Sequence, residues 1–144
     1  MQPSLETIVS DFDLLDDWED RYRYIIDLGR ELEPLADAAH NDANKVAGCV
    51  SQVWLETSIS DGADPVITYK GDSDAHIVRG LVALVLAIYS GKKATGILAE
   101  DALAILKSLG LDQHLSPQRS NGLKSMVLRI QRDASAALAS RTVN

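Results

Sequence analysis

Residues 46–60 read VAGCVSQVWLETSIS, and this stretch decides the fold class because its hydrophobic period is that of a strand. From Cys49 onward the odd positions are largely apolar and the even positions mostly polar, which predicts an amphipathic strand that begins at this cysteine. Turn chemistry follows in SDGADP (60–65), and then comes the β-branched and aromatic VITYK (66–70). The sequence therefore predicts a β-hairpin, and residues 44–46 are the candidate for a short third strand.

Helical patterns flank the hairpin on both sides. Acidic residues crowd the first turn of a helix expected to begin near Asp16 and to be stopped by Pro34. The almost continuously apolar residues 77–88 predict a central buried helix. Further helices are expected within ILAEDALAILKSLG (97–110) and from Pro117 onward. Helices, a small antiparallel sheet and more helices together predict an α+β fold.

Composition limits the class of protein. A chain of 144 residues with 46% hydrophobic residues predicts one globular domain over residues 1–144. The net charge is −7, and residues 1–42 hold twelve acids against three bases, so no basic footprint for nucleic acid is present. The acidic part is either a solvated helical face or a field that steers a basic protein partner.

Two further features bear on the compartment. No apolar run reaches the roughly 18 residues that a membrane span needs. One cysteine cannot form an internal disulfide, which fits a reducing environment. We therefore expect a cytoplasmic protein with no membrane partner.

The single cysteine, Cys49, follows Gly48, which permits a turn or a close backbone approach. Three interpretations stay open from the residues alone: a small buried hydrophobe, a nucleophile with a histidine base, or a thiol for sulfur or redox exchange. The available histidines are His40, His76 and His114. A metal or iron–sulfur site is not expected, because one cysteine without a neighbouring histidine supplies too few ligands.

Two charged residues lie at expected helix starts. Arg119 falls in the first turn of the helix from Pro117, where the helix dipole disfavours a cation by up to roughly 1 kcal/mol. Either a bound anion or partner compensates for this cost, or a nearby acid pairs with the guanidinium. Asp74, at the start of the central helix, is more simply expected to be a cap.

Four segments, in order and at similar spacing, resemble the SufE family of sulfur-acceptor proteins, whose close relative is CsdE. They are DRYRYIIDLGRELEPL (20–35), NKVAGCVSQVWL (44–55), GDSDAHIVRGLVAL (71–84) and LSPQRSNGLKSMV (115–127). The resemblance extends from about Thr7 to Leu138. It departs from the family pattern at Val50, where glutamine is frequent, and at Glu33, where proline is common. These departures leave open which desulfurase is the partner.

The resemblance implies a fold like that of the iron–sulfur scaffold (IscU-like) proteins, with helices on one face of a three-stranded antiparallel sheet. It implies that Cys49 accepts persulfide sulfur from a cysteine desulfurase of the SufS or CsdA type, stimulates that enzyme, and passes the sulfur to the iron–sulfur assembly scaffold. The chain would then be a carrier and not an enzyme, without a cofactor of its own, because pyridoxal phosphate belongs to the desulfurase.

By matching positions, the resemblance makes Arg119 and Asp74 candidates for partner contact or for shaping the acceptor site. It makes Gln52 a candidate for orienting the loop and Gly48 a candidate hinge. Family members are often dimeric, so a homodimer is also an expectation. Two alternatives remain: a CsdE-like acceptor that delivers sulfur to another pathway, and a partner that activates the desulfurase without taking sulfur.

Overall fold

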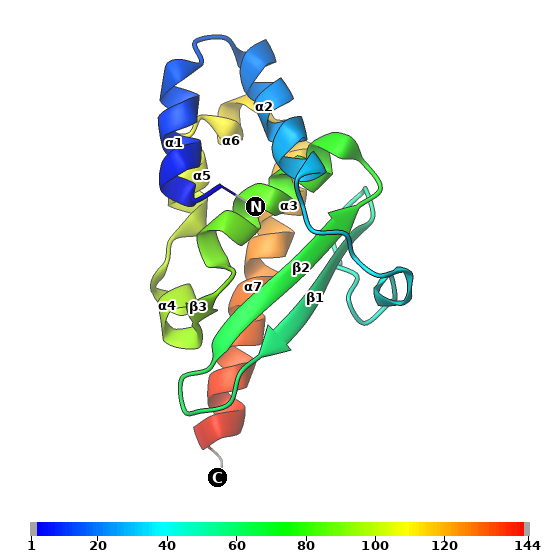
Figure 1. Ribbon diagram of the computed structural model, residues 1–144, viewed down its shortest axis with the longest axis vertical. Coiled ribbons are helices and arrows are strands. Elements are labelled where there is room, and N and C mark those ends of the chain that lie inside the picture. Colours follow the sequence, from blue (N-terminus) through cyan, green and yellow to red (C-terminus); the bar gives the residue numbers. More distant parts are fainter. Residues whose placement is uncertain (1–2, 143–144) are drawn as a thin grey trace.

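The computed structural model describes residues 3–142 of the chain. Within this range an antiparallel sheet of three strands has the order β1-β2-β3 (Figure 1). Strand β1 (Val53–Ile59) pairs along its length with β2 (Val66–Ser73), and β3 (Lys92–Lys93) pairs with the beginning of β2. The predicted α+β class and the predicted hairpin are confirmed. The likeness to the IscU fold and the single domain over residues 1–144 stay predictions.

The helices pack around a central member. They are α1 (Leu5–Leu14), α2 (Trp18–Arg30), the 3₁₀ helix η1 (Asp37–Ala39), α3 (His76–Tyr89), α4 (Ala94–Ala99), α5 (Ala102–Ser108), α6 (Leu111–His114) and α7 (Pro117–Thr142). Helix α3 contacts α2, β2 and α7, and it is buried along most of its length. It lies behind the hairpin together with α7, as Figure 1 shows. The apolar segment 77–88 therefore forms the expected central helix.

The core is closed on one side by the hairpin and on the other by a close helix crossing. Val53, Leu55 and Ile67 are fully buried, whereas residues that alternate with them in the hairpin are more exposed. At the crossing of α2 and α3, a Cβ atom added to Gly80 would collide with the backbone of Ile25. Only glycine lets the two helix backbones approach this closely.

The predicted start of the first strand was wrong. Strand β1 begins at Val53, whose partner is Ser73, the last residue of β2. The chain then turns into α3, so residues 49–52 have no strand to pair with and form a loop. The predicted third strand was also wrong. In residues 44–46, Lys45 forms only an isolated bridge with Trp54, and the third strand lies instead at the opposite edge of the sheet.

Helix boundaries differ from the expectations in three places. Helix α2 ends at Arg30, before it reaches Pro34, the residue expected to stop it. Helix α2 begins at Trp18 because the side chain of Asp17 accepts a hydrogen bond from the backbone of Glu19 and caps it. The stretch 97–110 holds the end of α4 and a separate helix α5, which the side chain of Asp101 caps. Helix α7 begins at Pro117 as predicted. In the described part of the chain, no helix combines the length and apolarity needed to cross a membrane.

Candidate functional site

Cys49 lies in a loop before β1. The N-terminal side of this loop is held to α7 by hydrogen bonds. The guanidinium of Arg129 donates hydrogen bonds to the carbonyl oxygens of Ala43 (2.9 Å) and Lys45 (3.2 Å). The amide of Val46 then donates to the carbonyl of Val53 (2.8 Å), which ties the loop to the first residue of the strand. The chain is therefore anchored three residues before Cys49.

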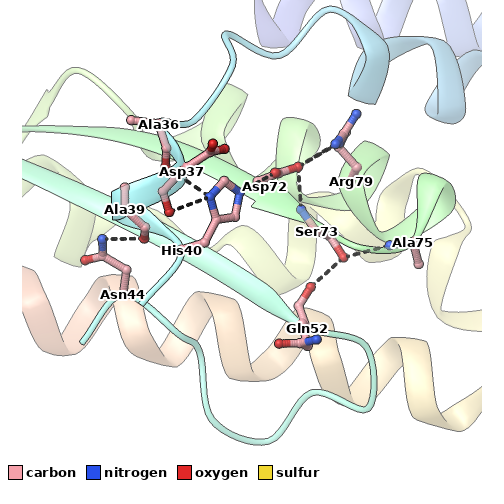
Figure 2. Close-up of polar contacts among 10 residues, drawn as sticks. All are labelled: Ala36, Asp37, Ala39, His40, Asn44, Gln52, Asp72, Ser73, Ala75 and Arg79. Atoms are coloured by element: carbon pink, nitrogen blue, oxygen red, sulfur yellow. Dashed lines mark hydrogen bonds and ion pairs between the residues drawn. The ribbon is translucent and has the colours of Figure 1, made fainter. Parts of the chain in front are cut away.

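The C-terminal side of the loop is fixed to the segment between β2 and α3. The backbone amide of Gln52 donates to Asp74 Oδ1 (3.0 Å), and the Ser73 hydroxyl donates to the carbonyl of Gln52 (2.7 Å), as Figure 2 shows for the second contact. Asp74 does not cap α3 with its side chain, since the residue at the cap position is Ala75 and no side-chain cap bond forms there. The expected cap was wrong, and the carboxylate of Asp74 instead holds the loop.

Between the two anchors, residues 47–51 come close to α7 at Gly48. Its φ is +89°, a conformation that side-chain-bearing residues rarely adopt. A Cβ atom at this position would lie 2.5 Å from Ser125 Oγ of α7. Glycine is therefore required twice here, once for the dihedral angle and once for the close approach to the helix.

The thiol of Cys49 faces a pocket of about 270 Å³ along the first three turns of α7. Its Sγ lies 3.7 Å from the carbonyl oxygen of Gly122. The residues that line this pocket are Cys49, Val50, Ser51, Val78, Leu81, Ser116, Gln118, Arg119, Gly122 and Met126. Arg119 is the one charged residue among these described lining residues, so a thiol and a single cation share a pocket whose walls are both polar and apolar.

The pocket raises the pKa of the Cys49 thiol above its ordinary value. Burial causes this rise in pKa, because the half-buried sulfur loses hydration that a thiolate needs. In this conformation the sulfur is therefore a protonated, weakly nucleophilic thiol at neutral pH. Arg119 has its backbone amide bonded to the hydroxyl of Ser116 (3.3 Å), so it occupies the first turn of α7 as predicted.

A second polar cluster joins the segment after α2, strand β2 and helix α3 (Figure 2). Asp72 Oδ2 lies 2.7 Å from His40 Nε2, and Asp72 Oδ1 lies 2.7 Å from a guanidinium nitrogen of Arg79. The other ring nitrogen of His40 faces the carbonyl of Ala36 (3.0 Å). Both ring nitrogens therefore face acceptors, which is the arrangement that favours a doubly protonated imidazole.

The pKa shifts of this cluster follow from those contacts. The hydrogen bond with Asp72 raises the pKa of His40, and the backbone carbonyls add to the rise. Burial alone would raise the pKa of Asp72, but hydrogen bonds from His40, from the amide of Ser73 and from Arg79 outweigh it and lower that pKa. The result is a charged latch that ties the segment after α2 to the sheet.

The histidine-assisted nucleophile receives no support from this geometry. His40 is engaged by Asp72, His114 stacks on Trp18 with ring centroids 3.9 Å apart, and His76 is exposed at the start of α3. None of these three described histidines lines the pocket of Cys49. Across residues 3–142, no group of three or more His, Cys, Asp or Glu side chains is placed to hold a metal ion.

Comparison with known proteins decides the family. A family model described as SufE, Fe-S metabolism associated domain, matches residues 6–134. The chain belongs to the SufE family. An uncharacterized SufE-like protein of Rhizobium meliloti is 54% identical over 136 residues, covering 94% of this chain and 97% of that protein. One of Rhizobium etli is 57% identical over 137 residues, covering 94% and 93% respectively.

A solved structure agrees with the fold of this SufE-family chain. The solution structure of a hypothetical protein from Thermus thermophilus superposes with a TM-score of 0.74, covering 96% of this chain and 98% of that one at 18% identity. Identity this low shows the fold alone. Membership of the SufE family supports a sulfur-acceptor role in Fe–S metabolism.

The residues singled out in the sequence fall into two groups in this SufE-family structure. Cys49 and Arg119 line one pocket, and Gly48 presses the loop against α7 beside it. Gln52 and Asp74 do not line that pocket, but they bond to each other at the end of the loop. Sequence reasoning missed the anchor made by Arg129, and no local signal could have found it, because 84 residues separate it from Lys45.

Proposed function

We propose that this protein accepts the outer sulfur of a persulfide held by a pyridoxal-phosphate cysteine desulfurase, carries it on Cys49, and relays it to an iron–sulfur scaffold. Removal of that sulfur would stimulate the desulfurase, because the enzyme must be cleared before its next turnover. The support is family membership together with one free thiol at a pocket that also holds Arg119. The cytoplasm is the compartment that we propose, since its reductants keep a lone thiol free.

The chemistry balances without an external oxidant. The Cys49 thiolate attacks the outer sulfur of the donor persulfide, so a new S–S bond forms as the donor's own S–S bond breaks. The electron pair of the broken bond leaves on the donor cysteine as a thiolate. That thiolate takes up the proton that Cys49 lost, and the transferred sulfur keeps its oxidation state throughout.

Because the pKa of Cys49 is raised, the transfer first requires the thiol to lose its proton. A thiol that stays protonated in its pocket reacts slowly with any electrophile, so the resting protein is protected from adventitious oxidation. Transfer requires the sulfur to reach a setting where the thiolate is better stabilised. We propose that docking of the desulfurase moves residues 47–51 between their two anchors, and that the guanidinium of Arg119 stabilises the thiolate and the persulfide anion.

The observation that carries this proposal is the pairing of Cys49 and Arg119 in one pocket of a SufE-family chain. The test is intact-mass measurement after mixing the protein with a cysteine desulfurase and cysteine. We expect one added sulfur atom, which reductant removes and which never appears on Cys49→Ser. A wild-type protein that gains no sulfur beside a desulfurase it binds would refute the proposal.

Desulfurase turnover separates covalent transfer from activation by docking alone. Alanine release from cysteine is measured with wild-type protein, with Cys49→Ser and with Arg119→Gln. If sulfur acceptance causes the stimulation, Cys49→Ser gives none, and Arg119→Gln lowers the rate of sulfur loading. Full stimulation by Cys49→Ser would assign the effect to docking and contradict the relay.

A further inference from the structure

Beside the Cys49 loop, and separate from its pocket, α7 and the preceding chain form a second hollow. We propose that this surface recognises an acidic patch on the protein that donates sulfur, an inference that rests on the proposed function. We call it the basic face and define it by Lys45, Ala47, Leu128 and Arg132. Neither the family description nor the relatives assign a role to these residues.

The basic face carries positive charge without a compensating acid in its lining. The hollow has a volume of about 240 Å³ and is lined by Lys45, Val46, Ala47, Ser125, Leu128, Arg129 and Arg132. Three of these residues are cations and none is an acid. Lys45 and Arg132 are exposed, and neither forms an ion pair with any residue that the structure describes.

Arg129 holds the basic face in shape and is not one of its free charges. Its guanidinium is bonded to the carbonyls of Ala43 and Lys45 and lies 3.5 Å from Asp133. Asp133 in turn accepts a hydrogen bond from the hydroxyl of Tyr69 in β2 (3.0 Å). The backbone of Lys45 is therefore fixed to α7 before any partner arrives, which lowers the ordering cost of binding.

The sign of this charge is opposite to that of the whole chain. The net charge is −7, yet residues 117–142 contain five bases and a single acid. A chain with this net charge has no overall attraction to an acidic protein. Beyond about 8 Å, charges are screened at physiological ionic strength, so the local cations decide which surface approaches the Cys49 loop.

The basic face is continuous with the reacting thiol. Ala47 lies two residues before Cys49, and Ser125, which lines the hollow, is the residue that Gly48 presses against. A protein that delivers a persulfide to Cys49 would therefore come close to this neighbouring surface. The face also has an apolar component, because 58% of Leu128 is exposed. Exposed apolar area beside charged side chains is typical of a surface that binds a protein partner.

The experiment compares charge reversal on the basic face with reversal elsewhere. The double variant Lys45→Glu/Arg132→Glu is tested beside Lys93→Glu, an exposed cation in β3 at the far edge of the sheet. Sulfur loading on Cys49 is followed against acceptor concentration with the cysteine desulfurase of the same organism. We expect the half-saturating concentration to rise on the order of ten-fold for the double variant and to stay near wild type for Lys93→Glu. Added salt should weaken wild-type loading more than that of the double variant.

Two further measurements separate the possible failures. Loading from inorganic polysulfide needs no protein docking, so the double variant should match wild type there, and an equal loss would place the damage in the loop and overturn the inference. Affinity for immobilised desulfurase reports on the basic face even where no sulfur moves. Unchanged affinity in the double variant overturns the inference, whereas tight binding without loading in wild type overturns the proposed function alone. Self-association that the double variant loses, with donor affinity intact, would assign the face to a second copy and also overturn the inference.

Discussion

Gly48→Ala tests whether the Cys49 loop can open without unfolding the rest of the protein. The position has φ of +89°, and the added methyl group would lie 2.5 Å from Ser125 Oγ. The anchors at Val46 and Gln52 do not involve the side chain of residue 48. The strain should therefore act on residues 47–51 and leave the hairpin and the helices as they are.

The magnitude follows from the two sources of strain. A non-glycine residue in a left-handed conformation costs roughly 1–2 kcal/mol. The contact with Ser125 adds less, because a serine hydroxyl can rotate away at a cost of about 1 kcal/mol or below. A shift of 1–2 kcal/mol changes an equilibrium by a factor of about 5–30. The open form of the loop should become more populated by that factor.

Alkylation of Cys49 by iodoacetamide measures this opening. We expect the rate near neutral pH to rise by about 5–30-fold in Gly48→Ala, as the change in population requires. The pH midpoint of alkylation should fall towards that of an exposed thiol, because burial is what raises the pKa of Cys49. The free energy of global unfolding should fall by no more than the same roughly 1–2 kcal/mol, because the strain raises the closed state relative to both the open and the unfolded states.

The variant Ser125→Gly supplies the matched control. Alone, it removes the hydroxyl that the added methyl group meets, and in combination with Gly48→Ala it leaves only the dihedral strain. The double variant should keep most of the faster alkylation if the dihedral angle dominates. An unchanged alkylation rate in Gly48→Ala, together with a global stability loss of about 2 kcal/mol, would refute the reasoning. The loop would then unfold only with the core.

Three other changes test the fold and its latches. His40→Gln should lower the free energy of unfolding most below the ordinary histidine pKa of 6.5, and the difference should vanish as pH rises through the raised pKa that Asp72 produces, in denaturation series across pH. Gly80→Ala should cost on the order of 3 kcal/mol by forcing α2 and α3 apart, and urea unfolding with a midpoint equal to wild type would contradict the close crossing. Arg129→Ala should release the carbonyls at 43 and 45 and speed alkylation of Cys49, whereas an unchanged rate would show that this anchor does not restrain the loop.

Local chemistry was enough to predict much of this fold. The apolar and polar residues alternate through β1, turn residues follow at 60–65, and the residues of α3 are apolar almost throughout. These local patterns were enough to predict the hairpin and the central helix. The start of β1 at Val53 could not be predicted from the sequence. Residues 49–52 alternate as a strand would, but a strand needs a neighbour, and β2 ends opposite Val53. The end of the neighbouring strand depends on the tertiary structure, so the hydrophobic pattern of residues 49–52 alone could not predict it.

In the candidate site, too, local sequence patterns identify residues but do not predict how the residues are arranged. Cys49 stands out because the chain has a single thiol, and Arg119 stands out because it opposes the helix dipole. Their shared pocket depends on how α7 lies against the loop, which no local pattern specifies. Asp74 was expected to cap α3, yet its carboxylate bonds the amide of Gln52. Both roles satisfy a backbone amide, so residue type alone could not separate them.

The arrangement around Cys49 also bears on why the thiol is held by a loop and not by a strand. A residue in the middle of β1 would lose ladder hydrogen bonds whenever it moved, and each lost bond that is left unsatisfied costs about 1–3 kcal/mol. Residues 47–51 lie outside the ladder, while Val46 and Gln52 on either side are bonded to the strand and to the segment before α3. Movement between these anchors leaves the sheet intact. A sulfur carrier needs its thiol in two environments, one that protects it and one that makes it react, and a short loop between fixed ends can supply both at a cost of a few kcal/mol or less.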